Sequence, residues 1–161
     1  MKRTVPTADP AVSASIFTHL LVAHHLGDYL VQRSSDAEAK SKSGPEGRRA
    51  CTRHVTSYTA TQLATVVLGA TATGVRLRPG SVLAGAALSA VTHWVIDRRT
   101  PLQTFARAVG REKFYSFGAP REGHGDNPCL GTGAHAIDQT LHKLVLAGSA
   151  LLMGLGARRV R

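Results

Sequence analysis

The chain has 161 residues, which suits a single domain, and its 20 Lys and Arg against 10 Asp and Glu give it a net charge of +10. Such a basic balance favours a nucleic acid, an anionic membrane surface or an acidic substrate as the partner. The two cysteines make neither a disulfide framework nor a CxxC metal motif, and aromatic residues at 5% are too few for a thick aromatic core.

Four mostly apolar runs, nearly free of Lys and Arg, are the predicted helices. They cover residues 11–32, 54–75, 80–97 and 132–156. Each has about 18–25 residues, the length that a helix needs to cross about 30 Å of hydrocarbon. The second and third runs lack the charged outer stripe of a soluble bundle, and their small residues suit close helix contacts in a membrane. We therefore predict an all-α fold in which residues 1–161 form one domain, an up-down four-helix transmembrane bundle.

The first run ends with His24 and Asp28. A signal peptide is not expected at its start, because Asp9 and Pro10 interrupt the approach to the apolar region. After this run, Gly and Pro in residues 44–47 predict a break in the first connection. The second helix is then expected to open at His54.

A tight link from Gly74 to Pro79 leads to the third run, which ends with His93 and Asp97. Residues 98–130 are too long for a plain hairpin link. Within them, an apolar pattern at i, i+3, i+4 and i+7 predicts a short amphipathic helix in the third connection, formed around Leu102, Phe105, Ala106 and Val109. Two placements fit this helix, one on the membrane surface and one packed on the mouth of the bundle.

Three His–Asp pairs spaced four residues apart lie inside the apolar runs: His24/Asp28, His93/Asp97 and Asp138/His142. Eight His and six Asp placed at random would give fewer such pairs. A helix puts residues i and i+4 on one face, so each pair presents an imidazole and a carboxylate together. Ionisable side chains cost at least about 2.5 kcal/mol each at mid-membrane, which points to a functional reason for them.

Chain direction places all three pairs at one end of the bundle. In an up-down arrangement, the ends of the first and third helices lie beside the starts of the second and fourth. The order reverses to Asp-then-His in the fourth helix, so aspartate is nearer the mouth each time and histidine lies one turn deeper. His54 is expected at the same end.

Imidazole and carboxylate together suit a divalent metal such as zinc, manganese or iron. The predicted ligands are seven side chains: His24, Asp28, His54, His93, Asp97, Asp138 and His142. The three aspartates are also the candidate catalytic residues, as metal bridges or general bases. Gln32, His135 and Gln139 are expected to orient the ligands. His124 and Asp126, in a glycine-rich loop, are more typical of turn residues.

The segment AHHLGDYLVQ resembles a bacterial and phage family of multi-pass membrane proteins, the domain of unknown function family 3307. Its H-x-x-G-D-[FY]-x-x-Q signature is matched by His24, Gly27, Asp28, Tyr29 and Gln32. Later family features look like His54, HWVID at His93 and Asp97, and DQTLH at Asp138, Gln139 and His142. The resemblance spans nearly the whole chain and implies transmembrane helices, without an activity. The length and basicity of residues 98–130 depart from the family pattern.

The basic residues in the connections predict on which membrane face the cluster lies and what class of substrate it binds. The two connections on the cluster side carry twelve Lys and Arg, and the opposite side carries seven. The positive-inside rule therefore predicts a multi-pass cell-membrane protein with its cluster at the cytoplasmic face. Arg98 and Arg99, with Arg48 and Arg49, would rim the site and bind an anionic small-molecule or lipid substrate. We accordingly expect a metal-dependent hydrolase acting on a phosphate-bearing or lipid-like substrate.

Two alternatives stay open. One is a non-enzymatic membrane interaction or structural protein whose His–Asp hydrogen-bond network only stabilises the bundle. The other is a soluble basic helical protein that binds nucleic acid. No specific nucleic acid is expected, because the basic residues lie in loops and tails with few aromatic residues among them.

Overall fold

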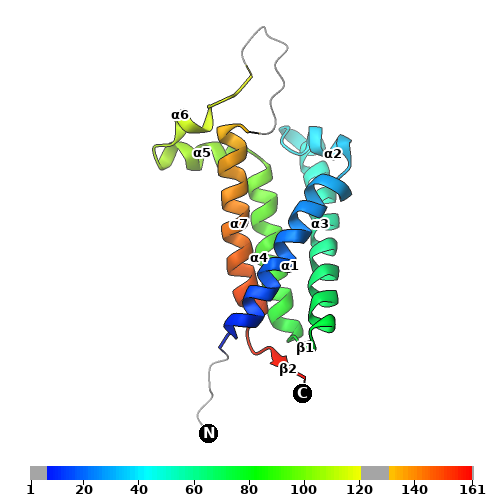
Figure 1. The fold of residues 1–161 in the computed structure, drawn as a ribbon. Coiled ribbons are helices and arrows are strands. Elements are labelled where there is room, and N and C mark those ends of the chain that lie inside the picture. Colours follow the sequence, from blue (N-terminus) through cyan, green and yellow to red (C-terminus); the bar gives the residue numbers. More distant parts are fainter. Residues whose placement is uncertain (1–6, 121–130, 161) are drawn as a thin grey trace.

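Four long helices form the body of the computed structural model, which describes residues 7–120 and 131–160. They run alternately up and down (Figure 1) and are α1 (Pro10–Leu26), α3 (Gly44–Ala72), α4 (Pro79–Asp97) and α7 (Gly133–Met153). Helix α1 contacts α3 and α7, and α4 contacts the same two helices from the other side. The described chain is mostly helical, as predicted.

The shorter elements gather at the two ends of the bundle. At the end opposite the termini lie a π-helical turn, η1 (Gly27–Val31), and the short helices α2 (Ser34–Ala39), α5 (Thr100–Ala108) and α6 (Glu112–Tyr115). At the other end, strands β1 (Val75–Arg76) and β2 (Arg158–Arg159) pair antiparallel, so the link between α3 and α4 lies beside the last described residues of the chain.

Helix α3 begins ten residues before the predicted start at His54. The Gly44-Pro45 pair does not break the chain here but opens the helix. Proline is tolerated in the first helical turn because the amide hydrogen that it lacks has no partner there in any case. His54 consequently lies in the third turn of α3, still at the height where α1 and α4 end.

The apolar core fills the half of the bundle near the termini. It comprises Val12, Ile16, Leu20, Val66, Ala86, Leu146, Ala150 and Met153. Helices α4 and α7 approach closely at Gly85, where an added Cβ would lie 2.7 Å from the Ser149 carbonyl oxygen. Small residues at such contacts let helix backbones come together, as the composition predicts.

Among the described helices, α4 alone is both long and apolar enough to cross a membrane. Of the four helices predicted to span a membrane, one therefore has the required length and composition. The predicted amphipathic helix is α5, where Leu102 and Ala106 are buried against the bundle while Phe105 and Val109 remain exposed. The helix therefore packs on the bundle mouth and still presents apolar side chains outward.

Candidate metal centre

Five ionisable side chains from four elements meet at the end of the bundle opposite the termini. His24 comes from α1, Asp28 from η1, His54 from α3, and His93 with Asp97 from α4. All three histidines are at most 1% exposed. The i, i+4 spacing holds because each pair lies on one helical face, and the faces converge where the helices end.

The tightest group consists of His54, His93 and Asp97. The two imidazole Nε2 atoms are 2.9 Å apart, and Asp97 Oδ2 lies 3.3 Å from His54 Nε2 and 3.2 Å from His93 Nε2. Three donors that share a tetrahedral ion at bonds of about 2.0 Å are about 3.3 Å apart. The three atoms thus have the mutual spacing of metal ligands.

Asp28 extends this group towards α1. Its Oδ1 lies 3.3 Å from His54 Nε2 and 3.6 Å from His93 Nε2, and its Oδ2 lies 3.4 Å from His24 Nδ1. His24, Asp28 and His93 form a second group of three whose donor atoms can hold an ion. His24 is also tied to α7, because its Nε2 lies 3.1 Å from Gln139 Oε1.

His142 adds a ring from α7, although it belongs to neither group of three. Its ring centre lies 4.3 Å from that of His93 and 5.1 Å from that of His24. Its Nδ1 lies 3.0 Å from the Asp138 carbonyl oxygen and 3.4 Å from Asp138 Oδ2, while its Nε2 is buried without a hydrogen bond among the described residues. Anchoring one nitrogen and leaving the other free is how metal-binding histidines are usually oriented.

Below the histidines runs a buried chain of hydrogen bonds that the sequence analysis missed. Tyr58 Oη lies 3.3 Å from His24 Nδ1 and accepts a hydrogen bond from Gln62 Nε2, and Gln62 Oε1 accepts one from Ser89 Oγ, each at 2.9 Å. The signal was the spacing of His54, Tyr58 and Gln62, which puts all three on one face of α3.

Gly27 lets α1 and α3 come together at the site. A Cβ at this position would lie 2.7 Å from Tyr58 Cδ2, closer than real Cβ contacts come. The π-helical turn begins at this glycine and carries Asp28 on its second residue. Turns of this type occur preferentially at functional sites, and here the turn presents a carboxylate to three histidines, His24, His54 and His93.

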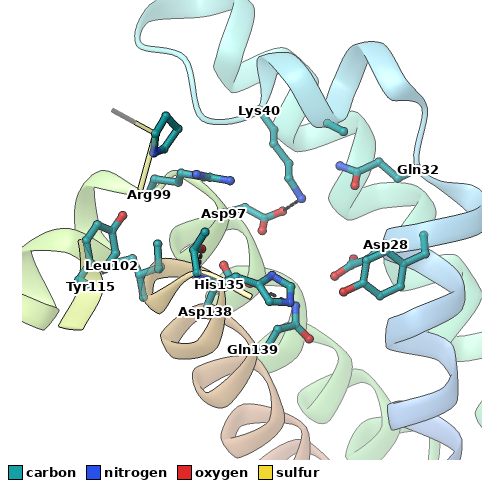
Figure 2. Close-up of a pocket in the computed structure, with 15 residues that line it drawn as sticks. Asp28, Gln32, Lys40, Asp97, Arg99, Leu102, Tyr115, His135, Asp138 and Gln139 are labelled. Atoms are coloured by element: carbon teal, nitrogen blue, oxygen red, sulfur yellow. Dashed lines mark hydrogen bonds and ion pairs between the residues drawn. The ribbon is translucent and has the colours of Figure 1, made fainter. Parts of the chain in front are cut away.

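A cavity of about 470 Å³ opens directly above the cluster. Its described lining includes all three predicted aspartates, Asp28, Asp97 and Asp138, and none of the four predicted histidine ligands. Figure 2 shows these carboxylates around the base of the cavity, with Gln32, His135 and Gln139 also facing it. The aspartates therefore lie nearer the mouth and the histidines deeper, as the reversed order on the fourth helix predicts.

Lys40 is a cavity residue that the sequence analysis did not single out. Its Nζ lies 2.9 Å from Asp97 Oδ2, and this ion pair crosses the cavity in Figure 2. The Gln32 amide is within 3.2 Å of the same Nζ when its oxygen is turned towards it. No motif marks Lys40, because its position depends on α2 folding back over the bundle.

The two predicted substrate-binding arginines occupy different places. Arg99 lines the cavity. Arg98 is absent from the described lining and donates to the carbonyl oxygens of Lys40 and Lys42, at 2.5 and 2.6 Å. In this structure Arg98 thus holds the end of α2 in place over the site.

Two further histidines of α1 belong to neither group of three. His19 is hydrogen-bonded to Ser15 of its own helix, and His25 stacks on Tyr29 with its ring centre 5.4 Å from that of His24. His124 and Asp126 lie outside the described residues.

At the cavity mouth, burial raises the pKa of the Tyr115 hydroxyl above its ordinary value, which keeps it a proton donor at neutral pH.

The donor set fits a divalent ion by two independent features. The nitrogen and oxygen donors of His54, His93 and Asp97 have ligand spacing, and a buried, unpartnered imidazole nitrogen of His142 lies beside them. Neutral imidazole and carboxylate are the mixture used by zinc, manganese and non-haem iron sites. The fold and site thus define a helical bundle with a buried His–Asp cluster that can hold a metal ion.

The chain belongs to the family described as protein of unknown function (DUF3307), whose model matches residues 16–156. The resemblance drawn from the sequence motifs is thereby confirmed at the level of the family. No curated protein and no solved structure matches the chain. The family carries no assigned activity, so any function has to come from the site itself.

Proposed function

We propose that this protein is a multi-pass membrane protein that binds a divalent metal in its His–Asp cluster and hydrolyses a phosphate-bearing or lipid-like substrate at one membrane face. The observation that carries the proposal is the triangle of His54 Nε2, His93 Nε2 and Asp97 Oδ2, with edges of 2.9 to 3.3 Å beneath an open cavity.

The outer surface of the bundle supports membrane insertion. Large apolar side chains point outward from every long helix, among them Val22, Val67, Leu68, Leu83, Val91, Leu144 and Leu151, which are 49 to 70% exposed. In water such a belt would be an aggregation hazard, whereas in a bilayer it faces lipid.

Hydroxyl groups on the outer surface are compatible with lipid. Thr18, Thr56, Thr71 and Thr140 are each bonded to the carbonyl oxygen four residues earlier on their own helices. A hydroxyl satisfied in this way needs no water partner, so threonine-rich helices can lie in a membrane. The threonines lower the hydropathy of α3, and their internal hydrogen bonds make that low value compatible with a helix in a membrane.

The arrangement at the cavity supports hydrolysis. A divalent ion held there would supply Lewis acidity and an activated water, both of which promote the hydrolysis of phosphate esters. Asp28 and Asp138 line the same cavity and can accept a proton from a water there. The wall of buried histidines and apolar helix below excludes bulk water from the floor of the site.

The proposal is tested by elemental analysis of detergent-purified protein. We expect the wild type to retain zinc, manganese or iron. The His93→Ala variant should retain about a tenth of that metal or less, because His93 belongs to both groups of three. His19→Ala is the matched control, since His19 belongs to neither group of three and is hydrogen-bonded to Ser15 of its own helix. A metal-free wild type, with no metal taken up on addition, overturns the proposal in favour of a purely structural network.

A further inference from the structure

We propose that the cavity above the cluster binds the phosphate group of an anionic ligand between the metal site and two cationic side chains, Lys40 and Arg99. The inference rests on the proposed metal site and names the residues that would recognise the substrate. Both side chains line the cavity, one from the end of α2 and the other from the start of α5. Figure 2 shows them reaching into the same space from opposite connections.

The size of the cavity suits a head group. Its volume of about 470 Å³ lies within the range of about 300–1,000 Å³ that small-molecule sites occupy. Tyr115 and His135 line it as further polar groups, and Leu102 adds an apolar side. A phosphate with a small organic or glycerol substituent therefore fits above the metal cluster.

The charge balance makes phosphate binding depend on metal. The described lining has three carboxylates, Asp28, Asp97 and Asp138, against the two cations. This negative surface repels an anion until a divalent ion adds its own charge. In the structure the Lys40 ammonium neutralises Asp97 at 2.9 Å, and a metal held by Asp97 would leave that ammonium for the ligand.

Arg99 is held in a strained backbone conformation at the cavity. Its φ is 58°, and it is the only described residue other than glycine with a positive φ. It is the central residue of a tight turn closed by the bond from the Thr100 amide to the Arg98 carbonyl oxygen, at 2.6 Å. Such turns are costly for residues with a side chain and persist where the surroundings enforce them.

The side-chain hydrogen bonds of the neighbouring Arg98 help to hold this backbone conformation of Arg99. The Arg98 guanidinium ties the junction between α4 and α5 to the carbonyl oxygens of Lys40 and Lys42, in the segment that directly follows α2. The two cations of the proposed phosphate site are therefore held at a fixed spacing by one structural arginine. This division of work explains why two consecutive arginines stand here and only one lines the cavity.

Titration calorimetry with inorganic phosphate on metal-loaded protein in phosphatidylcholine nanodiscs tests the inference. We expect Arg99→Gln and Lys40→Gln each to weaken phosphate binding about tenfold or more, the usual loss for a charge-assisted hydrogen bond. Arg111→Gln is the matched control, because Arg111 is exposed on the same connection and is absent from the described lining. Metal content is measured on every variant.

The outcomes separate this inference from the proposed function. Equal phosphate affinity in wild type, Arg99→Gln, Lys40→Gln and Arg111→Gln overturns the phosphate site, whatever the metal content. Loss of phosphate binding in Arg99→Gln at unchanged metal content supports it. Repeating the titration with phosphatidic acid in the nanodisc identifies the source of the phosphate: competition assigns a lipid head group, and no competition assigns a free phosphate compound. A metal-free wild type that still binds phosphate through Arg99 overturns the metal proposal and the metal dependence of phosphate binding, and leaves only the two cations as the phosphate site.

Discussion

The four histidines use their ring nitrogens differently, and this ranks them as ligands. Both nitrogens of His24 already have partners, in Gln139, Tyr58 and Asp28. His142 is anchored through Nδ1 and has Nε2 to spare. His54 and His93 point their Nε2 atoms at one another and at Asp97. An ion therefore fits most readily between His54, His93 and Asp97, with His24 holding the surrounding network.

Tyr58→Phe tests how far the hydrogen-bond chain supports the cluster. The change removes the hydroxyl that receives a hydrogen bond from Gln62 and contacts His24, leaving a buried amide without its partner. We expect a loss of about 1–3 kcal/mol in the free energy of unfolding and at least about tenfold in metal affinity. Thermal unfolding and metal titration measure the two effects. Tyr115→Phe, at the cavity mouth, is expected to change neither, and an unaffected Tyr58→Phe would show that the chain is incidental.

The Arg99→Gly substitution distinguishes the effect of Arg99 on the free energy of unfolding from its effect on phosphate binding. Glycine adopts positive φ without steric cost, so the substitution relieves the strain at this position. We expect the folded state to gain up to about 1 kcal/mol, reduced by the greater freedom of glycine in the unfolded chain, while phosphate binding is lost. Chemical denaturation and calorimetry give the two numbers. If the variant is destabilised by more than about 1 kcal/mol, the strained turn is not a binding device.

At the scale of elements, the π-helical turn and α2 complete the site. The first brings Asp28 to the histidines after Gly27 has allowed α1 to touch α3. The second folds back over the bundle, where Asp36 is buried in an ion pair with Arg53 of α3 and Lys40 reaches Asp97. The long helices thus supply the histidines and Asp97, and the short elements add Asp28 and the cations that line the cavity.

Gly27→Ala tests the close approach of α1 and α3. The added methyl group would overlap the Tyr58 ring, and moving either helix displaces Asp28 from His54. We expect a loss of about 1–3 kcal/mol of stability and a marked fall in metal affinity. Gly80→Ala is the control, because no atom lies within 4 Å of a Cβ there and alanine favours the helix. Equal behaviour of the two variants in thermal unfolding and metal titration contradicts this view of Gly27.

The sequence predicted the features that depend on periodicity and direction. Helical spacing puts His93 beside Asp97, and the reversal in Asp138 and His142 reflects a helix that runs the other way. Spacing contains no information about how connections fold back. The place of Lys40 depends on two hydrogen bonds from Arg98 to carbonyl oxygens far away in sequence. The early start of α3 was missed because a Gly-Pro pair ends one helix and begins another equally well.

The two ends of the molecule differ, and the surface of the bundle between them is apolar. One end holds the cluster, the cavity and most of the basic connections, and the other holds the β1–β2 pair and the described ends of the chain (Figure 1). Between them the surface is rich in exposed Val and Leu. Under the proposed function, a chain of this build would place its polar site at one membrane surface, with the apolar middle of the bundle in the lipid.

Cell fractionation tests the anchoring. If the proposed membrane insertion holds, lipid covers the exposed apolar side chains, so we expect the protein in the membrane pellet, retained after a high-salt or alkaline wash and released by detergent. Release by salt alone would mean that the basic connections bind the surface and the helices do not span. Recovery in the soluble fraction would remove the membrane proposal and leave the metal site to be tested in water.

Cysteine labelling in intact cells tests which way the molecule faces. The connections on the cluster side carry twelve Lys and Arg against seven on the opposite side, so the positive-inside rule predicts a cytoplasmic cluster. In a Cys129→Ser background, Thr73→Cys should react with a membrane-impermeant maleimide from outside, and Ser116→Cys only after the cells are permeabilised. The remaining Cys51 gives little background, because it is fully buried and burial raises the pKa of its thiol to about 11. The reverse labelling pattern would put the cluster outside, where its substrate would have to be an extracellular or periplasmic phosphate compound.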